Sequence, residues 1–154
     1  MNTDAEGRLI MADALAYAAE KKPDIICDVA TLTGAAVAAL GLDVGALFSN
    51  DSELESLFMR GSEKSLESYH PLPLHMDYKK LIESDIADMK NTGGRYGGAI
   101  TAALILEEFI DGNKWIHLDI AGPARSDNRK GATGFGVLGL YEFFKLMSTD
   151  LPES

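Results

Sequence analysis

The chain has 154 residues, 46% of them hydrophobic, which is enough apolar material for one sizeable core, so we expect a single domain over residues 1–154. Its 24 acidic and 14 basic residues give a net charge of −10, which disfavours binding to nucleic acids and to anionic membranes. No apolar run approaches the roughly 18 residues of a membrane span, and the polar, acidic amino terminus is unlike a targeting signal, so a soluble, cytoplasmic protein is expected.

The amino-terminal part of the chain predicts a helix followed by a strand. Apolar residues recur at helical spacing over 9–19, and Pro23 prevents the helix from continuing. The apolar run 25–30 is typical of a strand that is buried on both faces. This run contains Cys27, the only cysteine, which cannot form an internal disulfide and is therefore expected to be a buried, reduced thiol.

The alternation of helix and strand continues through the middle of the chain. Thr33 is expected to open an alanine-rich helix over 34–40, which Gly41 ends. A second strand is predicted over 44–48, and a polar helix is predicted over 51–66. After two prolines and a segment with mixed signals, the expected elements are a glycine loop over 93–98, a helix over 99–110, a strand over 115–120, a loop through Gly122, Pro123 and Gly131, and a helix over 134–147.

Strands that alternate with helices predict a three-layer α/β/α fold with a largely parallel central sheet. Only about three strong strands are visible, which is few for the helices that they must support. We therefore expect an incomplete sheet, whose further strands would belong to sequence upstream of this chain.

Two carboxylates and a guanidinium lie close together at the amino terminus. Asp4, Glu6 and Arg8 are spaced by two residues, and in an extended chain such residues share a face. Carboxylate oxygens suit hard cations and also zinc, and an arginine can hold a small anion or a developing negative charge. The alternative is an ordinary helix start, with Thr3 or Asp4 as its cap and Glu6 favoured by the helix dipole. Spacing alone favours this alternative.

The octapeptide over residues 2–9, Asn-Thr-Asp-Ala-Glu-Gly-Arg-Leu, resembles the signature of the leucyl aminopeptidase family, which is also called the cytosol aminopeptidase family or peptidase family M17. The similarity continues in the same order along nearly the whole chain. The further segments that resemble the family are 28–35, 84–88 with Asn91, 97–100, 115–122 and 133–137.

The resemblance implies a metal-dependent aminopeptidase, which hydrolyses the amino-terminal peptide bond of a peptide, with leucine preferred, by means of two divalent metal ions, zinc or manganese. By this resemblance Asp4 ligates one metal and Glu6 bridges both. Arg8 is the catalytic arginine, which holds a bicarbonate-like anion. The resemblance also implies a peptide substrate and a homo-oligomer, a hexamer in the complete family. The residues that match its substrate-binding positions are Thr31, Leu32, Gly34 and Ala121.

Members of this family also carry a lysine and two aspartates upstream of the octapeptide, which complete the metal pair, and a second lysine that contacts substrate. These positions precede Asn2 and are not in this chain, and Met1 can be a native internal residue. Because each catalytic metal needs about three protein ligands, we expect the isolated chain to be inactive or nearly so. An alternative is a non-catalytic subunit or interaction module that assembles with full-length homologues.

Other polar residues have simpler interpretations. His70 and His75 flank two prolines and are expected in a surface loop, and His117 is expected to be a hydrogen-bonded core histidine. Asp28 and Asp119 lie at predicted strand ends, where a structural role is favoured over metal ligation and a role behind the site stays open. The glycine cluster lacks the Lys-Ser/Thr of a phosphate-binding loop.

Overall fold

The computed structural model describes residues 4–87, 89–91, 93–94, 96–126 and 129–150. Its central sheet has the strand order β1-β4-β2-β3, in which β1 and β4 are parallel, β2 and β3 are parallel, and β2 and β4 are antiparallel. The sheet strands are β1 (Ile26–Ala30), β2 (Val44–Ser49), β3 (Ser68–Pro71) and β4 (Trp115–Asp119), and the hairpin strands are β5 (Arg125–Ser126) and β6 (Arg129–Ala132). The helices are α1 (Asp4–Ala19), α2 (Gly34–Leu40), α3 (Ser52–Ser65), the 3₁₀ helix η1 (Met76–Leu81), α4 (Gly98–Glu107) and α5 (Val137–Asp150).

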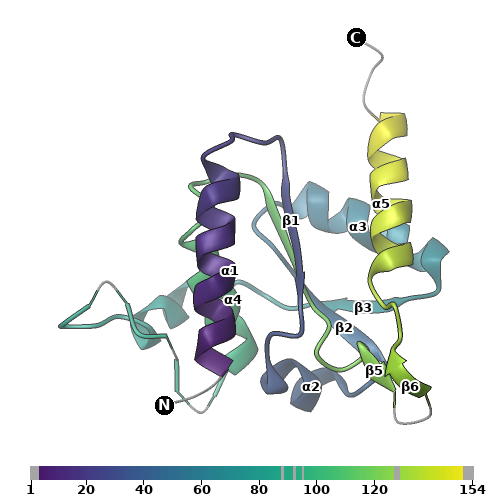
Figure 1. Cartoon of the computed structure of the whole chain (residues 1–154). Helices are drawn as coiled ribbons and strands as arrows, with labels where there is room; N and C mark the ends of the chain where they lie inside the picture. Colours follow the sequence, from purple (N-terminus) through teal and green to yellow (C-terminus); the bar gives the residue numbers. More distant parts are fainter. Residues whose placement is uncertain (1–3, 88, 92, 95, 127–128, 151–154) are drawn as a thin grey trace.

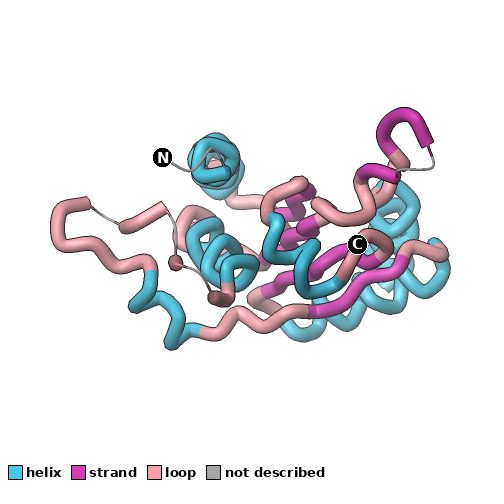
Figure 2. Tube along the Cα trace, turned by 90° about the horizontal axis from the view of Figure 1, so that it is seen from below, coloured by secondary structure: helices cyan, strands magenta, loops and turns pink. Residues whose placement is uncertain are grey.

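Helices cover both faces of the sheet, as the sequence predicts. Figure 1 shows α1 and α4 on one side of the strands and α3 and α5 on the other, and Figure 2 shows helices on both sides from below. One apolar core joins the sheet to α1, α2 and α4 around Phe48 and Trp115. A second joins it to α3 and α5 around Phe58 and Phe143, and a smaller third cluster lies around Ile82 and Leu104. Among the described residues, none of the helices combines the length and the apolar character that a bilayer crossing requires.

The helix boundaries follow the capping residues that the sequence contains. Thr33 caps α2 and its hydroxyl accepts a hydrogen bond from the backbone N–H of Ala36 at 3.0 Å. Gly41 ends α2 with a φ of 80°, a conformation that favours glycine. Asp51 caps α3, and its carboxylate accepts from the backbone N–H of Leu54 at 2.9 Å. The predicted limits of both helices are therefore confirmed.

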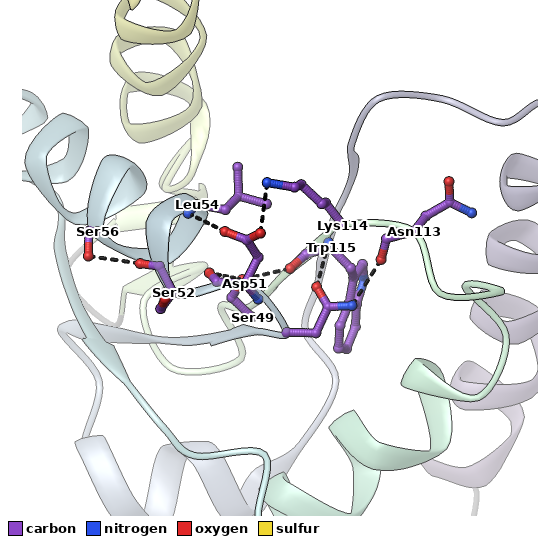
Figure 3. A network of polar contacts seen from close by, with 9 residues as sticks. Ser49, Asp51, Ser52, Leu54, Ser56, Asn113, Lys114 and Trp115 are labelled. Carbon is purple, nitrogen blue, oxygen red and sulfur yellow. Dashed lines mark hydrogen bonds and ion pairs between the residues drawn. The ribbon is translucent and has the colours of Figure 1, made fainter.

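A network of hydrogen bonds and one ion pair connects the start of α3 with the start of β4 (Figure 3). The Asp51 carboxylate that caps α3 also pairs with the ammonium group of Lys114 at 2.8 Å. The hydroxyl of Ser49, at the end of β2, donates to the backbone carbonyl of Trp115 at 2.8 Å. Because β2 and β4 are antiparallel neighbours, the end of β2 lies beside the start of β4. These contacts therefore connect α3 and the two strands at this end of the sheet.

Two strand features differ from the sequence prediction. The prolines were expected only to break the chain, but residues up to Pro71 form β3, whose pairing with β2 ends at Leu47 opposite Pro71. This position agrees with the edge placement that proline requires, since it has no N–H to donate. The expected loop after β4 also contains the hairpin β5–β6. Short strands of two to four residues lack the apolar alternation by which strands are recognised.

The first strand is more exposed than its apolar sequence predicts. Among the described residues β1 pairs only with β4, so one of its edges is open. Val29 is 37% exposed, and Cys27 is half-buried rather than buried. The prediction that this strand is buried on both faces is therefore wrong for the described part of the chain.

Candidate active site

The carboxyl ends of β1 and β4 form the centre of the candidate site. The two strands are parallel neighbours, and their last residues, Ala30 and Asp119, lie opposite each other. The loops that follow the two strands therefore begin side by side. After β1 it turns through residues 31–33 into α2, and after β4 it turns through residues 120–124. Loops at the carboxyl ends of parallel strands are the usual place for ligands in open α/β sheets.

The carboxylate of Asp119 joins these two loops. One oxygen, Oδ1, accepts hydrogen bonds from the backbone N–H of Leu32 at 3.0 Å and from that of Ala121 at 3.2 Å. The other, Oδ2, accepts from the hydroxyl of Thr33 at 2.6 Å. Asp119 is only 1% exposed, so these contacts are shielded from water. The expectation that Asp119 has a structural rather than a ligating role agrees with these contacts.

The loop after β4 also packs very closely against the end of α2. A Cβ atom added at Gly122 would lie 2.3 Å from the backbone carbonyl oxygen of Gly41, so only glycine fits there without a backbone shift. The backbone N–H of Ile120 donates to the carbonyl of Ala30 at 2.9 Å, which continues the pairing of the strands into the loops. The position of Ala121 is thus fixed from both sides.

Three of the four predicted substrate-binding residues lie on these two loops, and the fourth, Gly34, is the first residue of α2. Thr31 and Gly34 are exposed and Ala121 is half-buried. The side chain of Leu32 belongs to the apolar core and is 7% exposed, so only its backbone can face a substrate. Since Asp119 occupies its N–H, a substrate contact at Leu32 would involve its carbonyl oxygen.

The predicted metal ligands lie in the first turn of α1, which begins at Asp4. The expectation of an extended chain before the first helix is therefore wrong, because the backbone is already helical from position 4 onward. The side chains of Asp4 and Glu6 lie outside the described part of the molecule, so their ligand roles stay predictions. In Figure 1 the amino end of α1 lies at the same end of the molecule as α2 and the carboxyl end of β1.

Arg8 is buried, at 7% exposure, although it lies on a helix near the chain terminus. Its Nη1 donates to the backbone carbonyl of Asn91 at 2.7 Å. This contact links α1 to the segment before the glycine cluster, 83 residues later in the sequence. A buried guanidinium at this end of the molecule is suited to hold an anion, because little water screens it.

The glycines at the start of α4 allow a close approach between helices. Gly97 has a φ of 64°, and a Cβ there would lie 2.9 Å from the ring of Tyr78. A Cβ at Gly98 would lie 3.1 Å from that of Ala35 on α2. These glycines therefore let α4 begin directly against η1 and α2, which accounts for their presence without a phosphate ligand.

Behind the site, a second aspartate holds two aromatic side chains. Asp28 on β1 lies 2.5 Å from Nδ1 of His117 and accepts from the indole N–H of Trp115 at 2.7 Å. The His117 ring is fully buried and stacks with both Phe48 and Trp115. The prediction of a hydrogen-bonded core histidine is thus confirmed. Among the described residues, Nε2 of His117 has no hydrogen-bond partner.

The carboxylates of Asp4 and Glu6 are suitable ligands for divalent metals, but two residues are too few to bind two metal ions. Oxygen donors suit zinc and manganese, yet two metals with about three protein ligands each need more donors than two residues supply. In the described residues, no group of three or more His, Cys, Asp or Glu could hold a metal ion. His70 and His75 are both exposed, as expected, although His70 lies on β3 rather than in a loop.

Two other features lie outside this site. A cavity of about 480 Å³ lies beside the first turns of α3, lined also by Ile25 and Lys114 at the amino ends of β1 and β4, away from the two loops.

Burial, with a smaller effect of the Asp28 charge, raises the pKa of the Cys27 thiol to about 12. Such a thiol is not a nucleophile near neutral pH.

Comparison with known proteins relates the chain to one family. The family model "Cytosol aminopeptidase family, catalytic domain" matches residues 1–141. The chain is 55% identical over 150 residues to a probable cytosol aminopeptidase of Chlorobaculum tepidum, in a match that covers 94% of this chain and 30% of that protein. It is 54% identical over 150 residues to another from Prochlorococcus marinus, with 94% and 31% coverage. The chain thus spans about 30% of the length of the curated relatives that it matches.

Two solved structures are similar to this chain in both fold and sequence. A mutant of tomato leucine aminopeptidase is 47% identical, with a TM-score of 0.89 over 92% of this chain and 28% of the tomato chain. The bottromycin maturation enzyme BotP in complex with Mn is 41% identical, with a TM-score of 0.87 over 93% of this chain and 34% of the other. The match to the family model, over residues 1–141, includes both loops of the candidate site.

Proposed function

Because the chain belongs to the cytosol aminopeptidase family, we propose that it supplies part of the active site of a metal-dependent aminopeptidase. The reaction is hydrolysis of the amino-terminal peptide bond of a peptide, with leucine preferred. The observation that carries the proposal is the junction at the carboxyl ends of β1 and β4, where Asp119 ties together the loops of Leu32 and Ala121.

The proposed metal ligands on this chain are Asp4 and Glu6, in the first turn of α1. A pair of zinc or manganese ions would lower the pKa of a bound water and polarise the scissile carbonyl group. The relative BotP has been solved in complex with Mn, which supports a divalent metal here. The remaining ligands would come from sequence outside this chain, so we propose that the chain alone has little or no activity.

The other residues of the site bind and orient the peptide. Arg8, buried beside the carbonyl of Asn91, would hold a bicarbonate-like anion and stabilise negative charge as the tetrahedral intermediate forms. The exposed Thr31 and Gly34 would contact the peptide through their backbone groups. Ala121, fixed by Asp119 and by the close packing of Gly122, would form a wall of the side-chain pocket.

A hybrid enzyme tests this proposal. The matching segment of the Chlorobaculum tepidum relative would be replaced by this chain, and hydrolysis of leucine p-nitroanilide would be measured with added zinc or manganese. We expect turnover by the hybrid, loss of turnover by several orders of magnitude in its Glu6→Ala variant, and none from the isolated chain. A hybrid that folds and binds metal but does not cleave the anilide would refute the proposed function. Turnover by the isolated chain that depends on Glu6 would refute its proposed inactivity.

A second proposal, that the chain assembles with other copies or with longer homologues, is favoured by its exposed apolar side chains. Four of them project from one helix, α5, whose opposite face packs on α3: Val137, Leu138, Tyr141 and Phe144. Exposed apolar surface of this kind is typical of protein interfaces. Light scattering of the purified chain, alone and mixed with a full-length relative, would detect a hexamer or a mixed assembly, and a monomer in both samples would rule this proposal out.

A further inference from the structure

We infer that Asp119 is a positioning residue for peptide binding, which sets the backbone of both substrate-facing loops at once. The inference rests on the proposed function, because the loops are assigned to the substrate by family resemblance. Asp119 itself would touch neither the metals nor the substrate. Its side chain acts through the backbone of Leu32 and Ala121 and through the hydroxyl of Thr33.

The need for a carboxylate follows from the register of the two strands. Ala30 pairs with Asp119 at the end of the parallel ladder, and beyond this point Leu32 cannot continue the pairing, because residues 31–33 turn into α2. The backbone N–H groups of Leu32 and Ala121 both donate to the same buried oxygen. An oxygen that accepts from both satisfies two donors that would otherwise be buried without a partner.

The second oxygen extends this control to α2. The hydroxyl of Thr33 donates to Oδ2 and at the same time accepts from the backbone N–H of Ala36. The first turn of α2 is therefore held in place by the last residue of β4. All three contacts use Asp119 as an acceptor, which a carboxylate provides on both oxygens and a carboxamide provides on only one.

The residues of the loop after β1 and the first residue of α2 differ in exposure. Leu32 and Thr33 point into the protein and are buried, whereas Thr31 and Gly34 on either side of them are exposed. Asp119 thus holds the two inward residues and fixes where the two outward residues lie. Displacement of this loop would alter the peptide contacts, whereas the proposed metal ligands belong to a different element, α1.

The test uses Asp119→Asn, which keeps the shape of the side chain but directs an amide N–H₂ group at one of its partners. The matched control is Asp28→Asn, because Asp28 is also a β-strand aspartate in a largely buried network but contacts His117 and Trp115 instead of the loops. Thr33→Val removes the hydroxyl contact to Asp119 together with the cap on the backbone N–H of Ala36, and Thr33→Ser restores both.

The first measurement is amide hydrogen exchange in the isolated chain. We expect exchange at Leu32 and Ala121 to become at least about tenfold faster in Asp119→Asn relative to the control variant. The second measurement is steady-state kinetics of the hybrid enzyme with leucyl peptides. We expect KM to rise on the order of tenfold in Asp119→Asn with a much smaller change in kcat, a partial rise in Thr33→Val, and recovery in Thr33→Ser.

The outcomes separate this inference from the proposed function. A wild-type hybrid that folds and binds metal but is inactive would overturn the proposed function together with any role in peptide binding, whatever the exchange data show. An active hybrid in which Asp119→Asn changes KM no more than Asp28→Asn would overturn the positioning role alone. Unchanged exchange at Leu32 and Ala121 would overturn it as well, because the loops would then not depend on the carboxylate.

Discussion

Nδ1 of His117 lies 2.5 Å from Oδ1 of Asp28, across the paired strands β4 and β1. The two residues are directly opposite each other in the parallel register, and the imidazole is completely buried and stacks with two aromatic rings. The second oxygen of the same aspartate accepts from Trp115, so one carboxylate serves the polar groups of two large buried rings.

Removal of this carboxylate is therefore expected to destabilise the fold strongly. Asp28→Ala would leave the donors of His117 and Trp115 without a partner in the core, at a cost of roughly 3 kcal/mol in the free energy of unfolding. Asp28→Asn keeps one acceptor oxygen and should cost clearly less. Urea unfolding followed by tryptophan fluorescence measures both, since Trp115 is the only tryptophan. Equal stability of Asp28→Ala and the wild type would show that the pair contributes nothing.

The close approach at Gly122 gives a steric prediction. Gly122→Ala would place a Cβ 2.3 Å from the carbonyl oxygen of Gly41, and we expect a loss of about 2 kcal/mol in the free energy of unfolding. The matched control is Gly7→Ala, because a Cβ at Gly7 meets nothing within 4 Å and the residue lies inside α1. That change should stabilise the helix by about 0.5–1 kcal/mol. Thermal unfolding of the two variants should shift in opposite directions.

The start of α5 depends on a carboxylate from another part of the chain. Glu67 accepts from the backbone N–H of Gly136 at 2.9 Å and from that of Gly139 at 2.8 Å, one with each oxygen. Glu67→Ala removes both acceptors at a helix amino terminus and should cost about 1–2 kcal/mol. Glu67→Gln retains one acceptor and should cost less. Chemical denaturation would contradict this prediction if the two variants were equally stable.

The ion pair between Asp51 and Lys114 gives a pH dependence. The hydrogen bond from Lys114, followed by that from the backbone N–H of Leu54, lowers the pKa of Asp51 below its ordinary value of about 3.9. Because the folded-state pKa is the lower one, the stabilisation is fully present above pH about 4 and is lost as the pH falls through the lowered value. Asp51→Asn keeps a capping side chain but has no charge.

The comparison with Asp51→Asn isolates this single group from the other carboxylates. The difference in unfolding free energy between the wild type and this variant should be constant from pH 7 to about pH 5. It should then decrease as the pH is lowered below about 4. A difference that stays constant down to about pH 2 would show that the pKa of Asp51 is not lowered by folding.

The sequence predicted those elements whose signals are local. Thr33, Gly41 and Asp51 mark helix ends by their own side chains or backbone, and each of these boundaries is confirmed. The β4 strand was also predicted, because its apolar residues are closely spaced. The start of α1 was placed too late, since the charged residues before Leu9 carry no apolar period.

The features that were missed depend on contacts between distant segments. The pairing of β3 with β2 and the role of Glu67 at α5 involve partners that no local pattern reveals. For the site, the family resemblance indicated the two loops, but not that Asp119 connects them or that Gly122 must be a glycine. The sequence shows Thr33 before a helix and Asp119 at the end of a strand. No local pattern indicates that these two side chains form a hydrogen bond with each other.

The open edge of β1 has a consequence for how this chain behaves by itself. A row of main-chain donors and acceptors faces outward there, beside the partly exposed Val29, in the described part of the molecule. Such an edge can pair with a strand of another chain, so association of the purified chain should increase with its concentration. Dilution of the chain, or pairing of the β1 edge with a strand of a longer relative, would then reduce aggregation.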